Sequence, residues 1–171
     1  LFSDMIEDME GNYWFASLRY GVFLYNTGEK SWRLLKHKPD GLFATRPTRF
    51  LADDAHRALW ISDFSFGVFR YDFDKKTFDY NGMDSDKEGY LQSSLTNDLT
   101  LDKNGDVWVA TNSGGVCRYS QKEQKFTTYS METGLPENTI NSIAADLHGN
   151  IWISSHKGLT CLKPTGEIIK H

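Results

Sequence analysis

The chain has 171 residues, 39% of them hydrophobic and 25% charged, a composition that supports one packed domain and argues against disorder. The formal net charge of −4 excludes a general nucleic-acid binder, because there is no excess of lysine and arginine to neutralise phosphates. No apolar stretch approaches the roughly 18 residues of a membrane span, so no membrane contact is expected. Two cysteines without a C-x-x-C motif exclude a disulfide framework and a cysteine-based zinc site.

A repeat runs along the whole chain. Each unit contains a tryptophan with an aspartate six residues before it and, in three of the units, a glycine seven residues after it. The tryptophans are Trp14, Trp60, Trp108 and Trp152, and the aspartates are Asp8, Asp54, Asp102 and Asp146. The tryptophan spacings of 46, 48 and 44 residues predict four copies of one structural unit.

In chain order, the units are expected at residues 1–47, 48–95, 96–139 and 140–171. Each contains short stretches of alternating polar and apolar residues, separated by Gly, Asn and Asp, which indicates β-strands. In the third unit, the predicted strands are Asn97–Asp102, Asp106–Thr111, Val116–Ser120 and Lys125–Tyr129. Four strands in a unit of this length are typical of a β-propeller blade. The sequence therefore predicts an all-β fold of four four-stranded antiparallel blades, which form part of a larger propeller.

The recurring residues have structural roles first. The aspartate is expected to accept hydrogen bonds from turn amides, the glycine to supply a positive φ, and the tryptophan to fill the wedge between adjacent blades. Two units depart from the pattern: Arg57 replaces a turn glycine, and the fourth unit is one residue shorter after Trp152. Cys117 and Cys161 each lie nine residues after a tryptophan, so we expect equivalent, buried, apolar positions rather than a disulfide.

The pattern D-x-x-G-x-x-W, best developed in Asp102–Tyr119, resembles the two-component regulator propeller repeat. That repeat is found in the periplasmic sensor regions of hybrid two-component histidine kinases of Bacteroides-type bacteria. The resemblance implies a non-catalytic, cofactor-free sensor segment that detects oligosaccharides or another small polar ligand, with the kinase elsewhere in the parent chain. Four blades are too few for a complete propeller of that family. We therefore expect the remaining blades of the parent chain, or a second copy, to cover the end blades.

In propellers, ligands generally meet the face formed by the loops before each first strand and the turns between the second and third strands. The long connections Lys36–Pro47, Asn81–Thr96 and Ser130–Thr139 are therefore candidate binding loops. The candidate ligand-binding residues carry aromatic, basic or amide side chains on this face or at the entrance of the central channel. They are Arg19, Tyr20, Arg46, Arg49, Phe64, Phe66, Tyr90, Asn97, Asn112, Asn141, His156 and Lys157. Their aromatic rings suit sugar stacking, and their cationic groups suit uronate or sulfate groups.

The sequence assigns no catalytic and no metal-binding residue, since it has neither an H-E-x-x-H nor a G-x-S-x-G motif. Two alternative functions remain open. One is a propeller enzyme similar to streptogramin lyases, whose blades carry a related G-x-x-W pattern, with His156 as the base beside a metal. The other is a protein-interaction scaffold.

Overall fold

The computed structural model describes residues 2–35, 46–81 and 89–171 and contains four four-stranded antiparallel sheets. The first is β1 (Phe2–Glu7), β2 (Tyr13–Ser17), β3 (Gly21–Asn26) and β4 (Ser31–Leu34). The second is β5 (Pro47–Asp53), β6 (Ala58–Asp63), β7 (Gly67–Asp72) and β8 (Thr77–Asn81). The third is β9 (Thr96–Leu101), β10 (Val107–Thr111), β11 (Val116–Ser120) and β12 (Lys125–Tyr129). The fourth is β13 (Ile140–Ala145), β14 (Ile151–Ser155), β15 (Gly158–Leu162) and β16 (Ile168–Lys170). In each sheet the strands pair in chain order, so we call the sheets blades 1 to 4.

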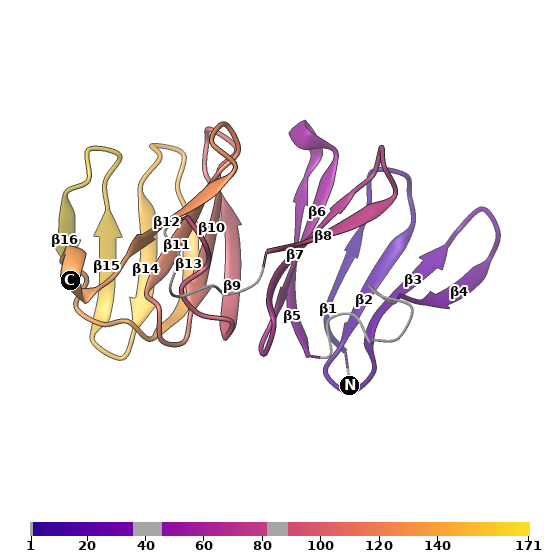
Figure 1. Cartoon of the computed structure of the whole chain (residues 1–171), viewed down its shortest axis with the longest axis horizontal. Coiled ribbons are helices and arrows are strands. Elements are labelled where there is room, and N and C mark those ends of the chain that lie inside the picture. Colours follow the sequence, from indigo (N-terminus) through magenta and orange to yellow (C-terminus); the bar gives the residue numbers. More distant parts are fainter. Residues whose placement is uncertain (1, 36–45, 82–88) are drawn as a thin grey trace.

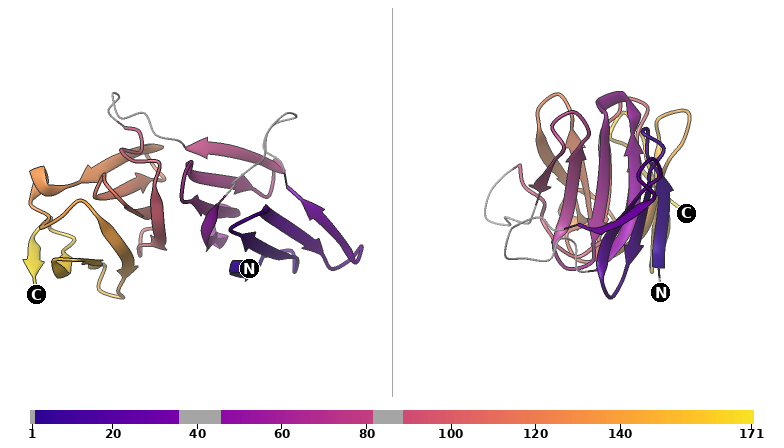
Figure 2. Two further views of the ribbon diagram at one scale, coloured as in Figure 1. Left: turned by 90° about the horizontal axis from the view of Figure 1, so that it is seen from below. Right: turned by 90° about the vertical axis from the view of Figure 1, so that its right-hand side faces the viewer.

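The blades stand side by side in chain order (Figure 1). Seen from below, they form an arch whose two ends, blades 1 and 4, point to the same side (Figure 2). The first strands β1, β5, β9 and β13 contact one another in sequence. The predicted propeller fold is confirmed. Among the described residues, two single-turn 3-10 helices lie between strands: η1 (Asp54–His56) between β5 and β6, and η2 (Met131–Thr133) between β12 and β13. In the part of the chain that the structure describes, no helix has the length and apolar character needed to cross a membrane.

In blades 1, 3 and 4, the aspartate of the repeat joins a turn to the tryptophan that follows. The Asp8 carboxylate uses Oδ1 to accept the backbone amides of Glu10 and Asn12, both at 2.9 Å, and uses Oδ2 to accept the Trp14 indole N–H at 2.7 Å. Trp108 and Trp152 donate in the same way to their aspartates, at 3.0 and 2.9 Å. The turn role of the aspartate is confirmed. Its bond to the buried indole, which satisfies the only donor of that ring, was not expected.

In blade 2, the position of the repeat aspartate differs from the one predicted. There the residue that accepts the indole N–H of Trp60 is Asp53, at 3.4 Å, and not Asp54 as expected from the spacing. The turn is one residue longer because η1 occupies it, and the chain leaves this helix through Arg57 at φ 46°, in the left-handed region. The first strand of blade 2 is therefore shifted by one residue relative to the other blades.

The tryptophans join the blades, as predicted. Trp14 lies 5.0 Å from Tyr71 of blade 2, and Trp60 lies 5.1 Å from Tyr119 of blade 3, measured between ring centroids. Trp108 belongs to a buried cluster that contains Ile151, Leu162 and other apolar residues of blade 4. Each of these three indoles is buried. Most of the hydrophobic core therefore lies between blades.

The two cysteines are buried and unbridged, as expected. The prediction that the two cysteines occupy equivalent positions in their blades is wrong, however. Cys117 pairs in register with Val109, one residue after the tryptophan of its blade, whereas Cys161 pairs with Trp152 itself. Because the fourth unit is one residue shorter, Cys161 lies on the opposite face of its strand from Cys117.

Candidate ligand-binding face

We call the loop before the first strand of each blade its entry loop. The entry loops and the turns between second and third strands meet on one face of the arch. The Gly67 amide at the turn of blade 2 donates to the Ser94 carbonyl in the entry loop of blade 3, at 2.8 Å. The Gly115 amide donates in the same way to the Asn138 carbonyl ahead of blade 4, at 2.9 Å. Each turn is thus fixed to the loop that enters the next blade, and both kinds of connection are available to one ligand.

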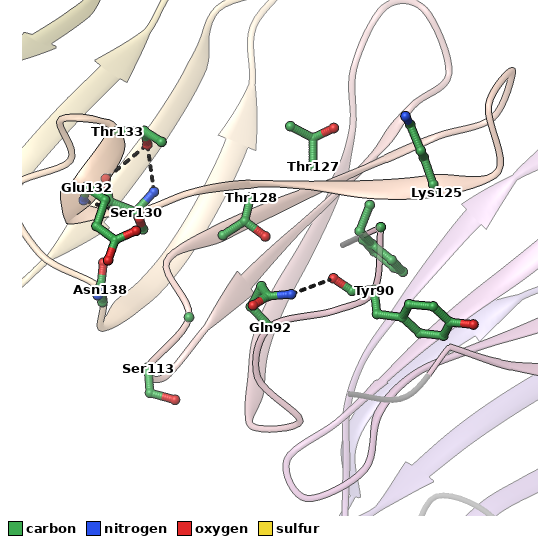
Figure 3. Close-up of a pocket in the computed structure, with 13 residues that line it drawn as sticks. Tyr90, Gln92, Ser113, Lys125, Thr127, Thr128, Ser130, Glu132, Thr133 and Asn138 are labelled. Atoms are coloured by element: carbon green, nitrogen blue, oxygen red, sulfur yellow. Dashed lines mark hydrogen bonds between the residues drawn. The ribbon is translucent and has the colours of Figure 1, made fainter. Parts of the chain in front are cut away.

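A pocket of about 830 Å³ lies on this face, over blade 3. Its lining comes from the entry loop, the β10–β11 turn, strand β12 and the connection to blade 4. The lining residues are Gly89, Tyr90, Gln92, Ser113, Gly114, Lys125, Phe126, Thr127, Thr128, Ser130, Glu132, Thr133 and Asn138. Its volume lies within the usual range for small-ligand sites. Hydroxyl and amide side chains surround the opening, and Tyr90 lies at one end (Figure 3).

Hydrogen bonds fix the two loop walls of the pocket. On one side, the Gln92 side-chain amide donates to the Tyr90 carbonyl at 3.3 Å. On the other side, Ser130 caps η2, and the Met131 amide donates to Asn138 Oδ1 at 2.7 Å. These bonds hold parts of both walls in place without a ligand, and such preorganisation lowers the entropic cost of binding.

Beneath the pocket, the Cys117 sulfur lies 3.5 Å from the Thr128 hydroxyl. Burial raises the pKa of this thiol, so it stays protonated and has little nucleophilic character. The lining therefore offers hydrogen bonds and an aromatic surface, which is chemistry for binding.

The predicted residues occupy several separate places. Tyr90 lines the pocket and is 48% exposed. Asn112 lies in the adjacent turn, where its backbone N–H donates to the Leu95 carbonyl. Arg46 stacks its guanidinium over Phe64 at 4.7 Å, next to the exposed Phe66. On blade 1 the Arg19 guanidinium lies 5.4 Å from the Tyr20 ring centroid, and on blade 4 both His156 and Lys157 are exposed.

Three other candidates belong to the first strands, where two of them join blades. The Asn97 side-chain amide donates to the Ile140 carbonyl of blade 4 at 2.7 Å. Arg49 forms an ion pair with Asp98 of blade 3 at 3.4 Å. Asn141 is exposed at the end of the arch.

Arg49 and Asn97 each lie eleven residues before the tryptophan of their blade, but the register shows that the equivalent of Asn97 in blade 2 is Thr48. Both Thr48 and Ser3 donate to a carbonyl of the following blade, at 3.4 and 2.8 Å. The shift has the same cause as the change from Asp54 to Asp53, namely the longer turn at η1.

Part of the pocket lining lies in two connections that the sequence named as candidate binding loops, Asn81–Thr96 and Ser130–Thr139. Tyr90 was predicted, and Ser130–Thr139 was named as a loop, but Gln92 and the threonines of β12 were not singled out. The signal was available in the length of the two connections, because long ordered loops are often binding loops. Parts of the other candidate loops, residues 36–45 and 82–88, lie outside the described residues.

A metal site was not predicted. Across residues 2–35, 46–81 and 89–171, no group of three or more His, Cys, Asp and Glu side chains is arranged to hold a metal ion. His156, the base of the lyase-like alternative, lies exposed on the turn of blade 4.

No family model and no curated protein matches the chain by sequence. Solved structures do match. The extracellular domain of the hybrid two-component system BT3049 from B. thetaiotaomicron is 25% identical, with a TM-score of 0.76 over 97% of this chain and 22% of that chain. The expected resemblance is confirmed. The corresponding domain of BT4673 from the same organism is 22% identical, with a TM-score of 0.80 over 99% of this chain and 24% of that one.

The chain thus spans less than a quarter of the sensor domains it matches. Virginiamycin B lyase from Staphylococcus aureus has a TM-score of 0.73 over 98% of this chain and 54% of that chain, at 13% identity. At that identity, the similarity to the lyase shows the propeller fold alone.

Proposed function

We propose that this chain is a non-catalytic, periplasmic ligand-sensing segment of a hybrid two-component sensor, and that its ligand is an oligosaccharide. The observation that carries the proposal is the match to the extracellular domain of such a system along 97% of the chain. The remaining blades of a parent sensor would extend the arch, and its kinase would lie elsewhere.

The pocket over blade 3 supports a neutral saccharide. Among the described residues that line it, the side chains are mainly hydroxyls and amides, and the charged ones are Lys125 and Glu132. Hydroxyl and amide groups can both donate and accept, as the hydroxyls of a sugar require. Tyr90 offers an aromatic face for the apolar side of a sugar ring. A sulfated or uronate sugar would instead need an excess of cationic groups.

The position of the pocket provides a route from binding to signalling. Its walls come from the connection between blades 2 and 3 and from the connection between blades 3 and 4. A ligand that contacts both connections favours the blade arrangement in which they lie closest to it. The equilibrium shifts only by the difference in ligand affinity between the two arrangements.

The test is thermal unfolding of the chain with a panel of neutral and sulfated oligosaccharides. A neutral member is expected to raise the melting temperature in proportion to its concentration over its dissociation constant. Tyr90→Ala is expected to lower the affinity for that ligand by about tenfold, because one stacking contact is lost. Tyr80→Ala is the matched control, because Tyr80 of β8 is 47% exposed, close to the 48% of Tyr90, and does not line the pocket. A panel without any stabilising sugar, or an equal loss in both variants, would contradict the proposal.

A further inference from the structure

Most hydroxyl groups that line the pocket over blade 3 already have a partner within the protein. The Ser130 hydroxyl accepts the Glu132 amide at 3.2 Å, and the Thr133 hydroxyl accepts the Ser130 amide and donates to the Ser130 carbonyl. The Ser113 hydroxyl lies 3.0 Å from the hydroxyl of Ser93 in the entry loop. These contacts hold the hydroxyls in place, so the choice of ligand depends strongly on the polar atoms that have no partner.

Asn138 presents a fixed hydrogen-bond donor on the wall that leads to blade 4. Its Oδ1 accepts the Met131 backbone amide at 2.7 Å. Because a backbone N–H can only donate, this contact determines which end of the planar side-chain amide faces η2. The other end, Nδ2, has no hydrogen-bond partner among the described residues and keeps access to solvent. An amide nitrogen of this kind can donate to a ligand but cannot accept.

Gln92 presents the opposite group on the wall that the entry loop forms (Figure 3). Its Nε2 donates to the Tyr90 carbonyl at 3.3 Å, and a carbonyl can only accept. The remaining atom of this amide, Oε1, has no partner in the part of the chain that the structure describes. Gln92 therefore offers an acceptor where Asn138 offers a donor.

Both walls rest on two consecutive glycines of the turn between β10 and β11. A Cβ at Gly114 would lie 3.2 Å from the Gln92 Cβ, and the Gly115 amide donates to the Asn138 carbonyl at 2.9 Å. Consecutive Cα atoms are only about 3.8 Å apart. A ligand group bound beside this turn therefore has Gln92 on one side and Asn138 on the other.

The chemical group that matches this pair is a secondary amide. A sugar hydroxyl rotates to donate or to accept, so a fixed donor and a fixed acceptor do not select it. A trans amide carries one N–H and one C=O that point in opposite directions. We propose that Asn138 and Gln92 are specificity-determining residues that select an N-acetylated sugar, whose acetamido carbonyl accepts from Asn138 Nδ2 and whose N–H donates to Gln92 Oε1. This inference rests on the function proposed above and names the class of sugar.

The test is an NMR titration of the chain with two matched pairs of sugars. N-acetylglucosamine is compared with glucose, and N-acetylgalactosamine with galactose, because within each pair an acetamido group replaces one hydroxyl. In at least one pair, the acetylated sugar is expected to bind at least about tenfold more tightly, which corresponds to about one net hydrogen bond. The side-chain amide signals of Asn138 and Gln92 are expected to shift with that sugar.

Variants of the two residues test their roles. Asn138→Asp keeps the oxygen that the Met131 amide needs and replaces the donor by an acceptor. It should lower the affinity for the acetylated sugar by about tenfold and leave that for the plain sugar unchanged, because a hydroxyl can donate to the carboxylate instead. Gln92→Met, which removes the acceptor, should act in the same direction. Asn112→Asp is the matched control, because it is the same substitution in the adjacent turn, at a residue that does not line the pocket.

Three results would overturn this assignment: equal affinities within both pairs, no binding of any of the four sugars, or variants that weaken both members of a pair equally. The last result would mean that the two residues only shape the pocket. In each case the proposed sensor function stands if another saccharide of the thermal-unfolding panel stabilises the chain, and fails with the assignment if none does.

Discussion

In this fold a single carboxylate can fix a turn by accepting several hydrogen bonds, and Asp72 is an example. Its Oδ1 accepts the backbone amides of Asp74 and Lys75 at 3.0 and 2.9 Å, and its Oδ2 accepts Arg70 at 3.1 Å. The Lys75 amide is the main cause, with the Arg70 guanidinium second, of a pKa that falls from 3.8 to about 2. The ionised form is therefore favoured by folding.

This shift predicts acid sensitivity. Because the pKa of Asp72 is lower in the folded state, its stabilising contribution is complete above its ordinary value of 3.8 and is lost as the pH falls towards about 2. Asp72→Asn keeps an acceptor but has no charge, so wild type should exceed it in stability at about pH 5 and lose that advantage by about pH 2. Urea unfolding of both proteins at the two pH values measures this. A difference that does not change with pH would contradict the assignment.

At the scale of a turn, space around the backbone decides which residue fits. Gly115 has φ +76°, and a Cβ placed there would overlap the Tyr129 carbonyl oxygen at the end of β12. Gly166 has a similar φ of +89°, but a Cβ there would meet nothing within 4 Å. The two glycines therefore share the conformational requirement and differ in packing.

Alanine substitutions separate the two effects. Both Gly115→Ala and Gly166→Ala impose backbone strain, but Gly115→Ala also forces β12 away from the turn. We expect it to lower the free energy of unfolding by about 2 kcal/mol more than Gly166→Ala does, the usual cost of overpacking. Chemical denaturation measures both variants. Equal losses would mean that the turn relaxes without disturbing β12.

The elements themselves were largely predictable from sequence, because strand alternation and repeat spacing report directly on the blade. The predicted strands Val116–Ser120 and Lys125–Tyr129 agree with β11 and β12. The predicted Asp106–Thr111 begins one residue before β10, and Asn97–Asp102 is displaced from β9 by one residue at both ends. The register of blade 2 was not predictable, since Asp53 and Asp54 are both aspartates. Left-handed residues at Lys30, Lys76 and Gln124 were also missed, because no glycine marks them.

The pocket was harder to predict than the blades. Its side chains come from loops whose positions depend on hydrogen bonds between blades, such as the one from Gly115 to Asn138. Loop length indicated where to look and Tyr90 was identified, but Gln92 and Thr127 follow no repeating pattern. Arg49 and Asn97 were predicted as ligand contacts from their place near the channel, and in the structure they contact neighbouring blades.

At the scale of the whole molecule, aspartates in two of the first strands, β1 and β9, accept hydrogen bonds from the blade that follows. Asp4 accepts the Phe50 amide of blade 2 at 2.8 Å. Asp98 accepts the Ile143 amide and the Ser142 hydroxyl of blade 4, at 3.1 and 2.6 Å. Each of these hydrogen bonds joins only two neighbouring blades, although Asp98 also forms its ion pair with Arg49 of blade 2. The loss of one hydrogen bond should therefore have a local effect, as in repeat proteins.

Hydrogen exchange can test this locality. Asp98→Ala should reduce the protection of the Ile143 amide by about tenfold, the loss of a hydrogen bond to a charged group, and leave that of Phe50 unchanged. Asp4→Ala should have the opposite pattern. If either variant reduces protection at both sites equally, the arch unfolds as a single cooperative unit.

The direction in which tryptophans are covered has a consequence for synthesis. Trp14 packs against Tyr71 and Phe78, and Trp60 packs against Tyr119, so each indole is covered by residues made later in the chain. A nascent chain that leaves the ribosome from its N-terminus therefore keeps the Trp14 indole in water until β7 and β8 have emerged. Folding then proceeds in one direction, one junction for each blade added. The most recently made blade leaves its tryptophan uncovered until another blade packs on it.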